Sequence, residues 1–315
     1  MTVLEAYRRT GADPPFGDPR RAHGVRFEGY YWRFTDAAAG RVVIVLCGVC
    51  RDAAGTWALV ALAAQPGGLV RSAIVPVART DPDGLGVEAA DVLRAAPDSL
   101  HVDLGPDARL DVALREPRPW PPRRAFGALG PAQLVPGLPQ YWHPHLLGAR
   151  VEGEARLGEA TVDLSAATAY AEKNWGPHFT EHWWWGQAQG FPDADACVAF
   201  AGGRIALAGV RAAPTAVVVR IADRVLRLAP PLARMTAEIG TGGWRIHGRS
   251  ARWAVEIEGE ARDEPAVLPV PEPGRRTVEH RSHHHLTGRL AVTVRRGRRT
   301  LFAGESGLAG LERWA

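Results

Sequence analysis

The stretch Tyr170-Ala171-Glu172-Lys173-Asn174-Trp175-Gly176, which leads into His182-Trp183-Trp184-Trp185-Gly186-Gln187, concentrates the most distinctive side chains of the chain. Lys173 is the only lysine and Asn174 the only asparagine among 315 residues that are rich in arginine. A lysine retained in such a chain suggests a place that needs a compact ammonium rather than a planar guanidinium. Four of the eleven tryptophans also lie in this stretch. We therefore predict a functional or interdomain site here. The alternative is an exposed turn whose charges pair locally.

The tryptophan-rich half of this stretch predicts a β-strand. Side chains in a strand alternate between two faces, so Trp183, Trp185, Gln187 and Gln189 share one face, and Trp184 lies on the other. An aromatic wall that ends in amides suits a ligand with an apolar tail and a polar head. The alternative is an ordinary sheet core in which the amides bond to the backbone.

Strand-like segments continue on both sides of the stretch. Residues 41–50, 56–64 and 69–77 are apolar and are separated by the turn sequences Asp52-Ala-Ala-Gly55 and Gln65-Pro-Gly-Gly68. Short strands at regular spacing with turn sequences between them are typical of antiparallel barrels and sandwiches. We therefore predict an all-β protein made of two antiparallel barrel or sandwich units, with a cleft in or between them.

The proline distribution predicts how the chain divides. Residues 117–144 carry many of the prolines, which is typical of a long connection between two β units. We predict an irregular N-terminal segment over residues 1–24 and an N-terminal β domain over 25–145 that includes the linker 117–144. The C-terminal β domain is predicted over 146–315.

The charge pattern excludes some classes of partner. The net charge is +4, but acidic residues nearly balance the scattered arginines, so no basic stripe for nucleic acid is predicted. No apolar run of 18 residues and no signal-peptide pattern occurs, which predicts a cytoplasmic protein. A peripheral membrane contact for collecting an apolar substrate stays open.

Two groups of residues could suggest a metal site, and both favour a structural interpretation. Cys47 and Cys50 lie in a predicted buried strand, where residues three apart point to opposite faces. Four histidines lie close together near the last strands, with Arg281 among them and no carboxylate or cysteine at ligand spacing. They are His280, His283, His284 and His285. We predict a solvated or partly buried strand start there, and no metal site.

Two motifs resemble the tocopherol cyclase family. The sequence Glu172-Lys-Asn-Trp-Gly176, followed by Trp183-x-Trp185-x-Gln187, is the specific part of the resemblance, and Phe27-Glu-Gly-Tyr-Tyr31 resembles the Phe-Glu-Gly-Trp-Tyr motif of that family. Tyr30 and Trp184 replace other aromatics, and the chain is shorter than the plant cyclases. The resemblance implies two lipocalin-like β units, similar to those of carotenoid hydratases and lipocalin-like pericyclases.

The resemblance also implies chromanol ring closure on a prenylated hydroquinone, without a metal or a redox cofactor. Protonating an alkene needs a carboxyl that stays neutral, which an apolar pocket achieves by raising its pKa. Either Glu28 or Glu172 could supply this acid. Lys173, Asn174 and Gln187 would hold the phenol oxygens. The residues expected to contact the substrate are Tyr31, Trp32, Tyr170, Trp175, His182, Trp183, Trp185, Gln187, His143 and His145.

Of the two carboxyls, Glu28 is the preferred donor at this point. It shares a strand face with Tyr30, Trp32 and Phe34, whereas Glu172 lies beside Lys173 and would pair with it. If Glu28 is paired with an arginine, either the two carboxyls exchange roles or the donor is one of His143, His145 and His182. A carrier of hydrophobic ligands, or a hydratase or pericyclase acting on another polyene, stays open, as do the substrate, the product and the oligomeric state.

Overall fold

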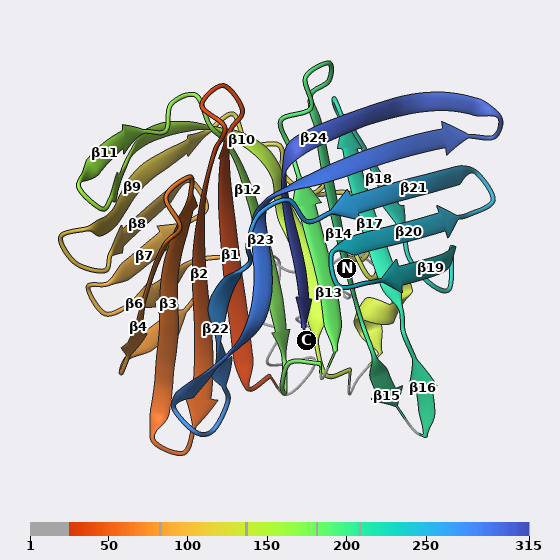
Figure 1. Ribbon diagram of the computed structural model, residues 1–315. Coiled ribbons are helices and arrows are strands. Elements are labelled where there is room, and N and C mark those ends of the chain that lie inside the picture. The colour runs from red at the N-terminus through yellow and green to blue at the C-terminus, as the bar shows by residue number, and fades with distance from the viewer. Residues whose placement is uncertain (1–24, 82–83, 136–137, 181, 208, 315) are drawn as a thin grey trace.

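The protein consists of two large antiparallel β-sheets that lie side by side (Figure 1). The computed structural model describes residues 25–81, 84–135, 138–180, 182–207 and 209–314. Within these ranges the one helical element is the short 3-10 turn η1 (Gly130–Leu134), which confirms the predicted all-β class. No helix among the described residues is long and apolar enough to cross a lipid bilayer. The segment predicted to be irregular, residues 1–24, lies outside the described residues.

The first sheet has 12 strands in the order β4-β3-β2-β1-β12-β10-β9-β8-β7-β6-β5, with β11 paired to β10. It curls until β5 packs against β2 and β3, where Arg51 donates to Thr80 Oγ1 at 3.1 Å. Its strands are β1 (Phe27–Asp36), β2 (Arg41–Asp52), β3 (Gly55–Gln65), β4 (Leu69–Val75), β5 (Ala78–Thr80), β6 (Val87–Ala89), β7 (Leu93–Ala96), β8 (Ser99–Asp103), β9 (Ala108–Arg115), β10 (Tyr141–Leu157), β11 (Ala160–Asp163) and β12 (Thr168–Gly176).

The second sheet has 10 strands in the order β18-β17-β14-β13-β24-β23-β21-β20-β19, with β22 paired to β23. A small hairpin of two further strands, β15 and β16, extends beyond it (Figure 1). These strands are β13 (Trp183–Ala188), β14 (Ala196–Gly203), β15 (Ile205–Leu207), β16 (Val210–Ala212), β17 (Thr215–Ile221), β18 (Arg224–Leu228), β19 (Arg234–Ile239), β20 (Gly243–Arg249), β21 (Trp253–Glu260), β22 (Ala266–Glu272), β23 (Thr277–Arg296) and β24 (Arg299–Trp314).

Three large apolar cores lie among the described residues, one inside each curled sheet and one between them, and there are two smaller apolar clusters. Strand β2 shows why, because its side chains are apolar on both faces. Val43 and Val45 point into the core of the first sheet, whereas Val42 and Ile44 pack into the core between the sheets. A continuous apolar run is expected for a strand that is covered on both sides. Cys47 lies in the first of these cores as a buried free thiol, as predicted.

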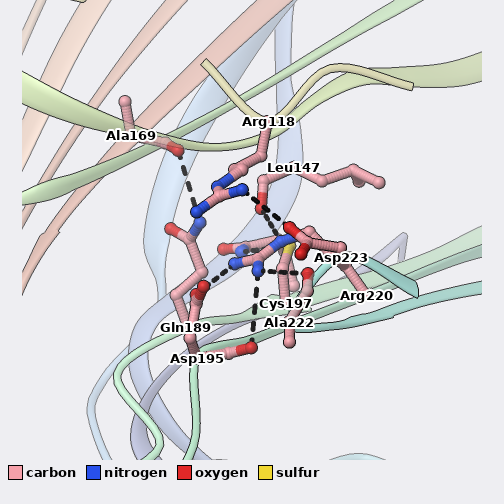
Figure 2. Close-up of polar contacts among 10 residues, drawn as sticks. Arg118, Leu147, Ala169, Gln189, Asp195, Cys197, Arg220, Ala222 and Asp223 are labelled. Carbon is pink, nitrogen blue, oxygen red and sulfur yellow. Dashed lines mark hydrogen bonds and ion pairs between the residues drawn. The ribbon is translucent and has the colours of Figure 1, made fainter. Parts of the chain in front are cut away.

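Buried hydrogen bonds join the two sheets across the middle core. The guanidinium of Arg220 on β17 donates to Leu147 O on β10 at 2.9 Å and to Ala222 O and Asp195 on its own side (Figure 2). Nearby, Gln189 Nε2 donates to Ala169 O on β12 at 3.3 Å (Figure 2). Since unpaired buried polar groups are costly, these contacts fix how the sheets face each other.

The sheets do not divide at the predicted boundary. Strands β10 and β12, residues 141–176, complete the first sheet, so the change of sheet lies between Gly176 and Trp183 rather than at residue 145. The proline-rich composition of 117–144 indicated irregular chain, but composition does not reveal which sheet the next strand joins. Backbone hydrogen bonds between Arg118 and both Leu147 and Gly148 hold the start of the proline-rich segment against β10.

Candidate active site

A cavity of about 340 Å³ lies between the two sheets, and the predicted stretch forms part of its wall. Trp183 and Trp185 enter it from β13, Glu172 and Asn174 from β12, and Tyr31 from β1. The rest of the lining is mostly apolar and includes Leu46, Leu59, Leu129, Leu138, Phe179, Ile205, Leu268 and Pro271. A largely apolar cavity with a few polar groups is typical of a site for a hydrophobic small molecule.

The carboxyl of Glu172 is buried at the polar part of this cavity, with only 4% of the residue exposed. Its Oε2 atom accepts hydrogen bonds from Trp142 Nε1 at 2.8 Å, Tyr170 Oη at 2.5 Å and Trp185 Nε1 at 2.9 Å. Burial raises the pKa of Glu172 to about 7 against the opposing effect of these three bonds, and the charge of Glu312 adds to the rise. Glu172 can therefore be a neutral acid near pH 7.

The three donors also determine which oxygen of Glu172 carries the proton. They all point at Oε2, and within the described part of the chain no hydrogen bond reaches Oε1. An oxygen that already accepts three hydrogen bonds has no free lone pair for a proton. The acidic proton of Glu172 therefore belongs on Oε1.

A second carboxyl group, Glu312 on β24, lies opposite His284 on β23 in the strand register. Its Oε2 atom is 3.4 Å from His284 Nδ1. Its Oε1 atom accepts hydrogen bonds from Trp183 Nε1 and Ser282 Oγ, each at 2.7 Å. Burial alone would raise the pKa of Glu312, but these partners, His284 above all, hold it below its usual range. The cavity therefore contains a neutral acid and an ionised carboxylate in separate environments.

Three polar groups that line the cavity are buried without a hydrogen-bond partner among the described residues. They are the Tyr31 hydroxyl, His284 Nε2 and Asn174 Oδ1. Asn174 lies directly over Gly29 of β1, where any larger side chain would collide with its Oδ1. Buried polar groups in folded proteins normally have partners, so these atoms are positioned to bind a polar ligand group or water.

Glu28 and Glu172 each have the environment that was predicted for the other. Lys173 Nζ lies 2.6 Å from Glu28 Oε2, and Arg51 also pairs with Glu28, so the predicted pairing of Lys173 with Glu172 is wrong. Successive residues of β12 point to opposite faces, which places Lys173 in the core of the first sheet, over the Tyr30 ring. Burial would raise the pKa of Glu28, but Lys173 and Arg51 hold it below its usual range. Glu28 is thus an ionised structural carboxylate.

Several residues predicted to contact substrate do not line the cavity. Trp32 packs inside the first sheet, and Trp175 stacks on Tyr141 with ring centroids 5.7 Å apart. His182 is exposed. Gln187 faces the interface of the sheets, where its Nε2 lies 3.6 Å from Cys197 Sγ. The predicted amide end of the aromatic wall therefore stabilises the sheet interface instead of a ligand.

Three more residues that were predicted to contact the substrate do not line the cavity either. His143 packs against the Trp120 ring, and neither it nor His145 lines the cavity. Burial lowers the pKa of both histidines to about 3, so each is neutral at physiological pH. Tyr170 contributes through its hydroxyl, which bonds to Glu172.

Many cavity residues were not predicted, and the polar and aromatic ones among them include Trp142, Trp184, His284 and Glu312. Trp142 was assigned to the linker because residues 117–144 are rich in proline. His284 was grouped with its neighbours, although alternation alone places it on the face opposite His283 and His285. The distant pairing that brings Glu312 to His284 has no local pattern in the sequence.

We predict that the Glu172 carboxyl makes folding stability pH-dependent. Its pKa is raised from 4.5 to about 7, so its contribution is fully present below pH 4.5 and is lost as pH rises through 7. This interval corresponds to about 3 kcal/mol. Urea unfolding from pH 4.5 to 8 should show the wild type losing that stability relative to a Glu172→Gln variant. A stability difference that does not change with pH would contradict the assignment.

Comparison with known proteins supports the resemblance seen in the sequence. The Tocopherol cyclase-like family model matches residues 139–313, more than half of the chain. Over 114 residues the chain is 30% identical to the chloroplastic tocopherol cyclase of Zea mays. This alignment covers 35% of this chain and 24% of the maize protein. The chain thus matches about a quarter of the length of that relative. Residues 139–313, the region matched by the family model, contain Glu172, Trp185, His284 and Glu312.

Two solved structures share the fold, and they confirm the predicted lipocalin-like architecture. Kievitone hydratase from Nectria haematococca has a TM-score of 0.55 at 10% identity, over 99% of this chain and 92% of its own. CghA in complex with Sch210972 has a TM-score of 0.59 at 13% identity, over 91% of this chain and 88% of its own.

Proposed function

The chain belongs to the tocopherol cyclase-like family, and we propose that it cyclises a prenylated quinol or a related isoprenoid phenol by acid catalysis. The observation that carries the proposal is the buried Glu172 carboxyl, whose Oε2 is occupied by Trp142, Tyr170 and Trp185. This leaves Oε1 to deliver a proton inside an apolar cavity. The maize relative, a tocopherol cyclase, points to the same substrate class.

The reaction follows from the groups around the cavity. Glu172 Oε1 protonates one carbon of a trisubstituted alkene, which leaves a tertiary cation on the other. The ring faces of Tyr31 and Trp185 stabilise this cation by about 0.5–2 kcal/mol each. The phenol oxygen then attacks the cation and forms the new C–O bond, and its proton leaves. The product is an isomer of the substrate, and its carbon skeleton is neither oxidised nor reduced.

Exclusion of water decides between ring closure and hydration. The apolar linker residues Leu129 and Leu138, together with Pro271 of β22, line the cavity and offer no hydrogen-bonding side chain to water near the cation. The fold is shared with a hydratase and with CghA, so a related addition to another polyene is the second candidate. A carrier would use the same cavity but would not need Glu172 to be an acid.

A panel of prenylated quinols tests the proposal. Each compound is incubated with the protein, and the products are analysed by mass spectrometry and by the loss of the free phenol. The expected product has unchanged mass and one phenol fewer. A gain of one water would assign a hydratase instead. Tight binding of the panel without any product would leave a carrier function and overturn the proposal.

A further inference from the structure

We propose that His284, oriented by Glu312, is the base that takes the proton from the attacking hydroxyl group of the substrate. This inference rests on the proposed cyclisation, which names an acid but leaves the phenol proton without an acceptor. It assigns a function to the two cavity residues that no motif of the sequence had singled out.

The position of His284 fits this function. The residue is 1% exposed, lines the cavity and packs against the rings of both Tyr31 and Trp185, at centroid distances of 6.0 and 5.3 Å. The Glu312 carboxylate lies 3.4 Å from Nδ1, and a ring that carries its hydrogen on Nδ1, facing this carboxylate, has the Nε2 lone pair free. No described residue hydrogen-bonds to Nε2. A hydroxyl group of the ligand would supply the missing partner.

Glu312 is itself firmly held. Both Trp183 and Ser282 donate to its Oε1 atom, which leaves Oε2 for His284. A carboxylate that fixes the tautomer and orientation of a histidine is the arrangement found where a histidine removes a hydroxyl proton. Glu312 is therefore a positioning residue, because it acts through His284.

One strand connects the acid to the carboxylate beside the base. Trp185 of β13 donates to Glu172, and Trp183, two residues earlier on the same face, donates to Glu312. Residues two apart in a strand are separated by about 7 Å. Glu172 and Glu312 are therefore held by neighbouring side chains on one face of β13, which forms part of the cavity wall.

The protons balance over the cycle. The O–H bond of Glu172 breaks as the C–H bond of the substrate forms, and the phenol O–H bond breaks as His284 Nε2 gains a proton. The cycle ends with Glu172 ionised and His284 protonated, and both return to their starting states by exchanging one proton with solvent after product release. No oxidant or co-reactant is consumed.

A coloured probe tests the base directly. The probe is a 4-nitrophenol with a prenyl group next to the hydroxyl, and its ionised form absorbs visible light. We expect the wild type to bind it as the phenolate and to lower its apparent pKa. His284→Gln should bind the neutral phenol and lose this shift, and Glu312→Gln should lose most of it. His283→Gln, on the opposite strand face, is the matched control and should behave like the wild type.

The outcomes separate this inference from the proposed cyclisation. The proposal that His284 is the base is rejected if the wild type does not bind the probe or leaves it neutral. It is also rejected if the His284→Gln variant still ionises the probe. Ionisation that depends on His284, without turnover of any quinol, would support the base and reject the cyclisation. With an active quinol, His284→Gln should lower kcat by about 10²-fold or more and leave KM within a few-fold. Thermal unfolding of each variant shows whether it remains folded.

Discussion

A Glu172→Gln variant should keep nearly wild-type affinity for the substrate and lose turnover by about 10²–10⁴-fold, the range expected for a general acid. The amide oxygen can accept the hydrogen bonds that Trp142, Tyr170 and Trp185 now donate to Oε2, so the cavity keeps its shape. The amide cannot deliver a proton to the alkene. Binding is measured by calorimetry with the substrate, and turnover by product formation under saturating substrate.

The pH profile gives this prediction a second measurement. Because the pKa of Glu172 is about 7 and its neutral form is the acid, turnover should fall about tenfold for each pH unit above that value. Glu154→Gln, an exposed substitution on β10, should show the wild-type rate and profile. If Glu172→Gln turned over substrate at the wild-type rate, the acid would have to lie elsewhere, and the function proposed for Glu172 would be rejected.

The sequence predicted the general location of the site because its residues are chemically unusual and close together. Tryptophans at positions 183 and 185 share a face by alternation, and both line the cavity as expected. The apolar segments and turns also predicted the all-β class. Such properties depend on local sequence, and a single chain reveals them without any knowledge of strand pairing.

The function of each carboxyl group depended on strand pairing, which the sequence does not show. Register places Tyr30 opposite Lys173, and Tyr31 opposite Glu172, so Glu28 and Lys173 meet on the inner face of the first sheet. Alternation within one strand could have separated Glu172 from Lys173. It could not have shown which of these faces meets the second sheet and forms the cavity wall.

The sequence did not single out His284 as the proposed base, and the reason is again strand pairing. His284 was judged together with His283 and His285, although its side chain points the opposite way, into the cavity. Its partner Glu312 lies 28 residues further along the chain, on the strand after a hairpin. Only the register of β23 with β24 brings the two together. Long-range pairing of this kind has no local sequence pattern.

A Glu28→Gln variant should lose about 3 kcal/mol of folding stability or more, while each folded molecule keeps its activity. Lys173 is 1% exposed and its ammonium lies 2.6 Å from Glu28, so removing the carboxylate leaves a buried charge without its counter-ion. Breaking a buried ion pair on one side typically costs about 3–5 kcal/mol. Arg51 also loses a partner, but its side chain is 19% exposed and can be solvated. Urea unfolding measures the loss.

A double variant isolates the buried charge as the cause. Glu28→Gln combined with Lys173→Met removes both members of the pair, and it should be more stable than Glu28→Gln alone because no isolated ammonium remains in the core. The partly exposed Glu152 pairs with Arg115 and Arg150, so Glu152→Gln is a surface control that should cost under about 1 kcal/mol. If Glu28→Gln instead kept its full stability and abolished turnover, Glu28 would be the proton donor after all. Its ion pair with Lys173 would then have to open during the reaction.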